Sequence, residues 1–328
     1  MTTEKFATLK EAVDRQRGFE LSKDLHDAMS GLADLPEVDV TQIADMLKET
    51  SSPTGAGFLA VWLGAGVERG KAAELTCSPV LETFLKWSTT VETPPERDES
   101  EADEDLAVDD VPAPEPNPET IAGLQLLGQS LVAHLARCPD QRREATQNEA
   151  IYREVRRLEH LSYGAGWVMH LFRQCSGRLV VLNAGNKNGV VVRYENIANC
   201  FHLFTLLQGV LAALMPDADQ PSEELLEIAR GRTEGTARDH AWWHYSQPTI
   251  NKPDIVGSVW GEMAPDGIAS VEGSQVLVLW PPIMASRTWD TGFFSPVLYA
   301  SPPHIEVLEV LSPPELDVWW QRLRLPML

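Results

Sequence analysis

Hydrophobic residues recur at three- and four-residue spacing through the first half of the chain, which is the period of an amphipathic helix. Ser or Thr residues of the kind that cap helices precede several of these stretches. The pattern predicts helices over 22–31, 41–49, 57–68, 78–87, 120–136 and 147–161. An antiparallel, HEAT-like array is the simplest arrangement in which such helices bury their apolar faces against one another.

The period of the hydrophobic pattern changes after residue 175. Two short β-branched runs flank the turn-rich loop 183–188, and this pattern predicts a β-hairpin over 178–194. A strongly apolar helix is predicted next, over 196–214, with hydrophobic side chains along most of one flank. We expect that helix to be central to the core.

The last third of the chain combines strand-like runs with many tryptophans. Strands are predicted over 275–280 and 304–310, and a final helix over 313–323 begins with Ser312 as its cap. Five tryptophans fall in this part: Trp242, Trp243, Trp260, Trp280 and Trp289. The predicted fold is therefore α+β, a mostly helical body with a β-hairpin and a small C-terminal α/β cap.

A short sequence repeat links the two helical parts. Gly55-Ala-Gly-Phe58 leads into one predicted helix and Gly164-Ala-Gly-Trp167 leads into another. A duplicated helical unit would explain the two copies, whereas a chance match would carry no structural meaning. Both interpretations stay open on the sequence alone.

A chain of 328 residues is longer than a single hydrophobic core usually supports, so more than one domain is expected. Composition indicates where the regions lie. Residues 91–119 contain twelve Asp or Glu, one Arg and six Pro, which predicts a disordered acidic linker. A docking segment for a basic partner is the alternative interpretation of this stretch. The other predicted regions are a helical domain at 1–90, a helical region with the hairpin at 120–230, and a Trp-rich α/β region at 231–328.

Charge and cysteine content restrict the classes of partner and compartment. The net charge of −21 argues against nucleic acid, which requires a basic surface. The charged N-terminal segment does not resemble a signal peptide, and no apolar run is long enough to predict a membrane span. The cysteines lie far apart and indicate reduced thiols: Cys77, Cys138, Cys175 and Cys200. We expect a cytoplasmic protein that binds no membrane.

Sequence motifs for common chemistries are weak or missing. The glycines of 183–189 lack the order of a phosphate-binding loop, and no Gly-x-Ser-x-Gly motif is present. His240 and His244 have the spacing that would place two imidazoles on one helical face, where they could bind zinc or act as an acid or base. Structural histidines beside packed tryptophans are the alternative. We predict no metal site and no cofactor.

The strongest candidate site follows the strand predicted at 275–280. Arg287 and Asp290 could form an ion pair that fixes a turn, with Trp289 packed on the guanidinium. Alternatively, Arg287 binds an acidic group of a ligand, Trp260 and Trp289 form the walls of a pocket, and Glu262 or Asp290 supplies a carboxylate.

These residues also carry a resemblance to a set of uncharacterised bacterial proteins. Trp260-Gly-Glu262, Pro281-Pro282 and the turn 287–292 resemble the W-x-W-N-E-G, G-P-P and R-S-W-N-x-G-R elements of that set. The helical segments 57–70 and 196–207 are similar to it as well. The resemblance implies a shared architecture, and we know of no activity for the set.

The chain departs from the pattern of that set at three positions. Trp280 stands where glycine is usual, Asp290 where asparagine is usual, and Phe293 where a second arginine is common. These differences weaken the case for an anion site shared with those proteins.

Tryptophan and arginine on loops are typical of binding hot spots, and an acidic body would attract basic partners. We therefore predict a noncatalytic interaction or accessory protein with a protein partner of basic character. An accessory component of a bacterial defence or immunity system is one setting for such a protein. The alternative is an enzyme for a small molecule, with a pocket of Trp260, Glu262, Arg287, Trp289 and Asp290, and with His240 or His244 as acid or base.

Overall fold

The chain forms two compact units, Met1–Phe172 (unit 1) and Arg173–Leu328 (unit 2). The computed structural model describes residues 2–30, 32, 36–92, 115–212, 214, 221–249, 252, 254–284, 286–291 and 296–323. Most of the predicted acidic linker at 91–119 lies outside the described residues, as does Phe293.

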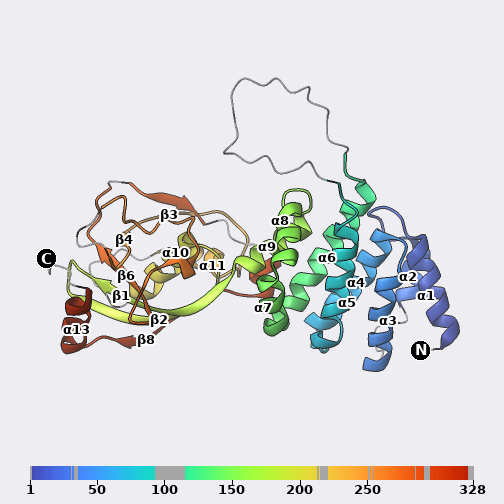
Figure 1. The fold of residues 1–328 in the computed structure, drawn as a ribbon, viewed down its shortest axis with the longest axis horizontal. Coiled ribbons are helices and arrows are strands. Elements are labelled where there is room, and N and C mark those ends of the chain that lie inside the picture. The colour runs from blue at the N-terminus through green and yellow to red at the C-terminus, as the bar shows by residue number, and fades with distance from the viewer. Residues whose placement is uncertain are drawn as a thin grey trace, which may run out of the picture. The chain divides into compact units, whose positions relative to one another are not determined.

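Unit 1 consists of helices in the part that the structure describes (Figure 1). They are α1 (Thr3–Arg15), α2 (Lys23–Ser30), α3 (Glu37–Glu49), α4 (Pro53–Glu68), η1 (Ala73–Leu75), α5 (Cys77–Ser88), α6 (Pro118–Arg137), α7 (Pro139–Gln147), α8 (Glu149–Leu158) and α9 (Tyr163–Arg173). All six helices predicted before residue 162 are present, whereas α1 was not predicted. Helix α7 was missed because its polar sequence buries only Ala145 and shows no clear apolar period.

Glycines bring the backbones of α4 and α9 close to α6. A Cβ atom on Gly123 would lie 2.5 Å from backbone atoms at the start of α4, and one on Gly128 would lie 2.4 Å from the backbone of Gly164 in α9. The repeated Gly-Ala-Gly segments at 55–57 and 164–166 therefore both lie against α6. Duplication of a helical unit stays a prediction.

Unit 2 is built around a sheet that has six strands within the described residues. The strands of unit 2 are β1 (Cys175–Asn183), β2 (Asn188–Ile197), β3 (Arg238–His240), β4 (His244–Ser246), β5 (Ser270–Val271), β6 (Ser274–Trp280), β7 (Thr288–Asp290) and β8 (His304–Val310). The main sheet has the order β4-β6-β1-β2-β8, with β5 paired to β6. Strands β3 and β7 form a separate two-stranded ribbon.

Helices cover both faces of the main sheet. The helices of unit 2 are α10 (Cys200–Leu211), α11 (Glu223–Ala229), α12 (Pro296–Ala300) and α13 (Pro313–Leu323), and a turn of 3₁₀ helix is formed by Pro265–Gly267. Because side chains alternate along a strand, Leu179 and Val181 of β1 share a core with α10, whereas Val180 and Leu182 share one with α13. The sheet is thus buried between two cores.

The α+β fold class is confirmed, but the hairpin has a different place from the one we predicted. Its strands occupy the middle of the sheet, because β1 is parallel to β6 and β2 is antiparallel to β8. The hairpin therefore belongs with the C-terminal strands, and the helices at 118–173 pack with the N-terminal ones. The division between the units accordingly falls inside the predicted 120–230 region.

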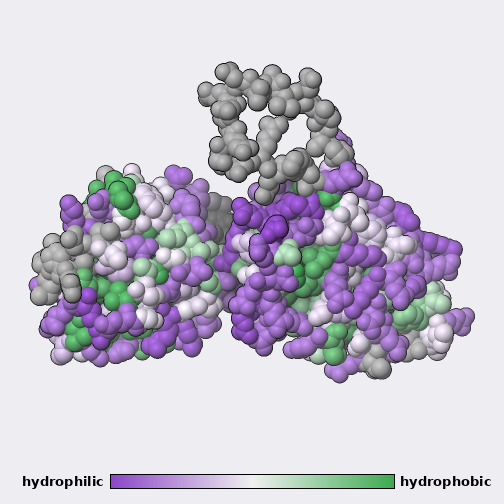
Figure 2. All heavy atoms as spheres, viewed as in Figure 1, coloured by the Kyte–Doolittle hydropathy of each residue, from purple (hydrophilic) through white to green (hydrophobic). Residues whose placement is uncertain are grey.

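The visible surface of each unit is mostly hydrophilic, with smaller hydrophobic areas (Figure 2). Among the helices of the described ranges, none has the length and apolar character needed to cross a membrane. The bulky aromatic side chains Trp280 and Tyr245 are fully buried in unit 2. The two cores of unit 2 therefore contain its largest buried aromatic side chains.

Candidate binding site

The structure brings together Trp260 and Arg287, two of the five residues predicted to share a site. The Cζ atom of Arg287 lies 4.9 Å from the centre of the Trp260 ring. Trp260 is 41% exposed, so one part of its indole contacts the guanidinium while another part faces solvent. The loop of Trp260 is fixed to β4, because Val259 donates its N–H to the carbonyl of Tyr245 at 2.8 Å.

Aromatic rings surround the guanidinium of Arg287. Its Cζ atom lies 5.5 Å from the centre of the Phe204 ring and 6.0 Å from that of Tyr245, in addition to Trp260. We call Trp260, Arg287, Phe204 and Tyr245 the Trp260–Arg287 platform. Cations over aromatic faces are stabilised by the ring quadrupole, and more strongly where water is partly excluded. The platform therefore holds a positive charge in a defined position at the surface.

Arg287 makes no ion pair with any carboxylate of the described residues. Its Nη2 donates to the carbonyl of Val259 at 2.9 Å, and the side chain is half-buried. Burial lowers the pKa of its guanidinium, and this is partly offset by Tyr245 and by the exposed Glu262 of the neighbouring loop. A half-buried arginine without a carboxylate partner is unusual, since buried charges are normally paired.

The predicted packing of Trp289 on Arg287 and the predicted Arg287–Asp290 ion pair are wrong. Trp289 is buried in the core, where its Nε1 donates to Thr205 Oγ1 at 2.9 Å. Asp290 is exposed, with Oδ1 3.3 Å from Nε of Arg238 on the paired strand β3. The reason is local: consecutive residues of a strand point to opposite faces, so Trp289 and Asp290 cannot line one pocket from β7.

His240 and His244 do not share a helical face, which was one of the two interpretations of their spacing. His240 ends β3 and is exposed, whereas His244 begins β4 and is buried, with Nε2 3.1 Å from the carbonyl oxygen of Asp254. Burial lowers the pKa of His244. In the described ranges, no three His, Cys, Asp or Glu side chains are grouped so that they could hold a metal ion.

A buried polar network beneath the platform was missed. Gln208 of α10 donates to both carboxylate oxygens of Asp239, at 3.2 and 3.1 Å, and accepts the Tyr245 hydroxyl at 2.6 Å. The backbone N–H of His240 also donates to Asp239, at 2.8 Å. Burial raises the pKa of the Asp239 carboxyl. A lone glutamine in the apolar stretch 200–211 was the available sequence signal.

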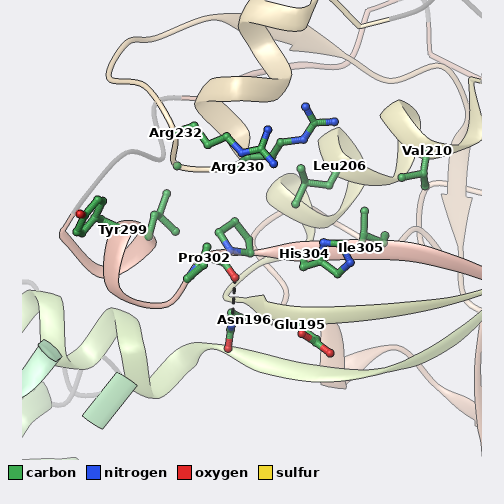
Figure 3. A pocket seen from close by; sticks show the side chains of 13 residues that line it. Glu195, Asn196, Leu206, Val210, Arg230, Arg232, Tyr299, Pro302, His304 and Ile305 are labelled. Atoms are coloured by element: carbon green, nitrogen blue, oxygen red, sulfur yellow. Dashed lines mark hydrogen bonds between the residues drawn. The ribbon is translucent and has the colours of Figure 1, made fainter. Parts of the chain in front are cut away.

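A cavity of about 1090 Å³ lies elsewhere in unit 2, and none of the predicted site residues lines it (Figure 3). Its walls are formed by α10, the turn that follows α11, α12, the end of β2 and the start of β8. Sequence reasoning missed it because the lining residues come from five separate segments. The closely spaced Arg230 and Arg232 were the only clear signal.

Comparisons with protein-family models, with curated proteins and with solved structures give no match to this chain. A function is therefore argued from the geometry of unit 2. The platform combines an exposed indole with an arginine that has N–H groups available for an acceptor. This combination is suited to binding a negatively charged group that lies beside an apolar surface.

Proposed function

We propose that this chain is a noncatalytic interaction protein, which binds a partner protein through the Trp260–Arg287 platform. The observation that carries the proposal is the half-buried guanidinium of Arg287, which lies under an exposed indole and makes no ion pair with a described carboxylate. Trp and Arg are enriched among the residues that dominate binding energy. Because the rings and the Val259 carbonyl hold Arg287 in place, little side-chain entropy would be lost on binding.

Exposed apolar side chains on the same loops support a protein as the ligand. Val256 is 93% exposed, and Ile255, Ile283 and Met284 are exposed as well. We expect an acidic side chain of the partner to pair with Arg287 while apolar neighbours cover Trp260 and Val256. At long range, the net charge of −21 would attract a partner of net positive charge.

A reducing, cytoplasmic location is part of the proposal. All four cysteines are free, and three of them are buried. Buried unpaired thiols are common in proteins of reducing compartments.

The enzyme alternative is less well supported, because Trp289 is buried and Asp290 pairs with Arg238 instead of facing Arg287.

Affinity purification of the tagged full-length chain from cells of its source tests the proposal. Wild type should retain a partner in a fixed molar ratio, and Trp260→Ala should reduce its recovery about tenfold or more, as expected for a hot-spot residue. Arg238→Ala is the matched control, because it removes an exposed arginine of unit 2 outside the platform. Equal recovery by wild type and by Trp260→Ala would refute the proposal.

A further inference from the structure

One wall of the cavity of about 1090 Å³ carries two arginines. In Figure 3, the side chains of Arg230 and Arg232 lie side by side at the α11 side of the cavity. One carboxylate, that of Glu227, accepts from Nη1 of Arg230 at 3.0 Å and from Nη1 of Arg232 at 2.8 Å. Nη1 of Arg230 also lies 2.9 Å from the largely exposed Glu223.

These bonds leave most of the guanidinium donors available. The hydrogen bonds to Glu223 and Glu227 use Nη1 of each arginine, and none of the described residues bonds to the Nε or Nη2 atoms of either one. Gly231 between them has φ of +69°, and a Cβ there would lie 2.6 Å from the Cβ of Leu298. A glycine is therefore needed for the turn that places both arginines on the same wall.

The remaining walls are largely apolar. Leu206 and Val210 come from α10, and Ile305 begins the buried side of β8. The exposed ring of Tyr299 lies at the rim. Glu195 is the acidic residue of the lining, and its Oε1 lies 3.2 Å from Nε of Arg193. The lining therefore presents two arginines that already contact Glu223 and Glu227, the imidazole of His304, the paired carboxylate of Glu195, and an apolar surface.

We propose that this cavity binds a small amphipathic anion, with a carboxylate or phosphate monoester head on Arg230 and Arg232 and an apolar body against Leu206, Val210 and Ile305. Guanidinium groups bind both kinds of head through charge-assisted hydrogen bonds. The volume lies slightly above the usual range for small-molecule sites, which leaves room for an extended apolar body. This site is separate from the platform of the proposed function.

Calorimetric titration of the full-length protein with decanoate, decyl phosphate and decanol, each in its monomeric form, tests the proposal. One or both anions should bind at one site per chain, and at least about tenfold more tightly than decanol, because decanol lacks the charge. A preference for decanoate or for decyl phosphate would identify the natural head group. Lack of saturable binding by both anions, or equal binding of decanol, would overturn the proposal.

Variants then locate the bound anion. Arg232→Gln and the double variant Arg230→Gln/Arg232→Gln should lose at least tenfold in affinity, whereas Arg238→Gln, outside the cavity, should bind as wild type does.

If the double variant does not fold, hydrogen exchange of the wild type locates the anion instead. Decanoate should protect 206–210 and 298–305 and leave 255–260 unchanged. Unchanged affinity in the arginine variants, or protection at 255–260 alone, would contradict the assignment. Trp260→Ala should leave anion binding intact, which separates this site from the platform.

Discussion

At the scale of single residues, the side chains of β7 point alternately to the core and to solvent, and this decides which of them can contact Arg287. The composition of 260–290 pointed to a site with indoles, an arginine and carboxylates, and Trp260 does meet Arg287. Periodicity could not show that Trp289 points inward, because that orientation depends on the pairing of β7 with β3. The sequence therefore brought Trp260 and Arg287 together correctly but assigned Trp289 and Asp290 to the wrong surroundings.

Asp239 provides a prediction about stability. Replacement by Ala leaves the Gln208 amide and the His240 N–H without their acceptor, and each unsatisfied buried group costs about 1–3 kcal/mol. Asp239→Asn keeps one acceptor oxygen, so we expect it to lose less stability than Asp239→Ala. Urea unfolding at pH 7 measures both. Equal losses in the two variants would show that the network does not stabilise unit 2.

The pH dependence of the same position follows from its pKa. Burial raises the pKa of Asp239 above its ordinary value of 3.8, so the folded protein retains the proton to higher pH than the unfolded chain does. The stability that this group contributes is then lost as pH rises through the folded pKa. Asn cannot ionise, so the unfolding free energy of Asp239→Asn relative to wild type should increase from pH 4 to pH 7. A difference that is constant with pH would contradict the burial of this carboxylate.

At the scale of elements, helices with caps and a clear apolar period could be predicted to within a few residues. Asn117, for example, caps α6 by accepting the N–H of Glu119, and Pro118 occupies the first turn. The two short strands in 238–246 were not predicted, because they are defined by partners far away in the sequence. Local pattern is a good guide for α-helices and a poor one for short strands whose pairing is non-local.

The space around two helical glycines predicts different effects of replacing each one by alanine. Gly128→Ala should destabilise unit 1 by about 1–3 kcal/mol, because a Cβ there would collide with the α9 backbone. Gly66→Ala in α4 is the matched control, since the nearest atom to its Cβ is the flexible Lys71 side chain at 3.4 Å. It should be neutral or stabilising by up to about 1 kcal/mol through helix propensity. Thermal unfolding followed by circular dichroism distinguishes the two; similar effects would contradict the close approach.

At the scale of the whole molecule, the two units have separate interiors that the hydrophobic pattern could not assign. The parallel pairing of β1 with β6 joins segments almost a hundred residues apart, and the cavity is formed by segments from 195 to 305. The strand pairing leaves no local pattern in the sequence, and the cavity leaves only the closely spaced Arg230 and Arg232. Composition indicated more than one domain, and only the contacts place the boundary after Phe172.

Separate interiors predict that the units unfold independently. Calorimetry should resolve two transitions, because each unit has a core of its own. Gly128→Ala should lower the midpoint of one transition, and Asp239→Ala should lower that of the other. A single transition that both variants shift equally would show that the units unfold as one cooperative body.

The central claim is that the Trp260–Arg287 platform is a recognition surface. Photo-crosslinking in cells of the source, with p-benzoylphenylalanine in place of Val256, tests it most directly. The same group in place of Val318, another exposed valine of unit 2, serves as the positional control. We predict one dominant protein adduct from position 256, which is lost when Arg287→Ala is added and is not formed from position 318. No adduct from position 256, or one that persists without Arg287, would contradict the claim.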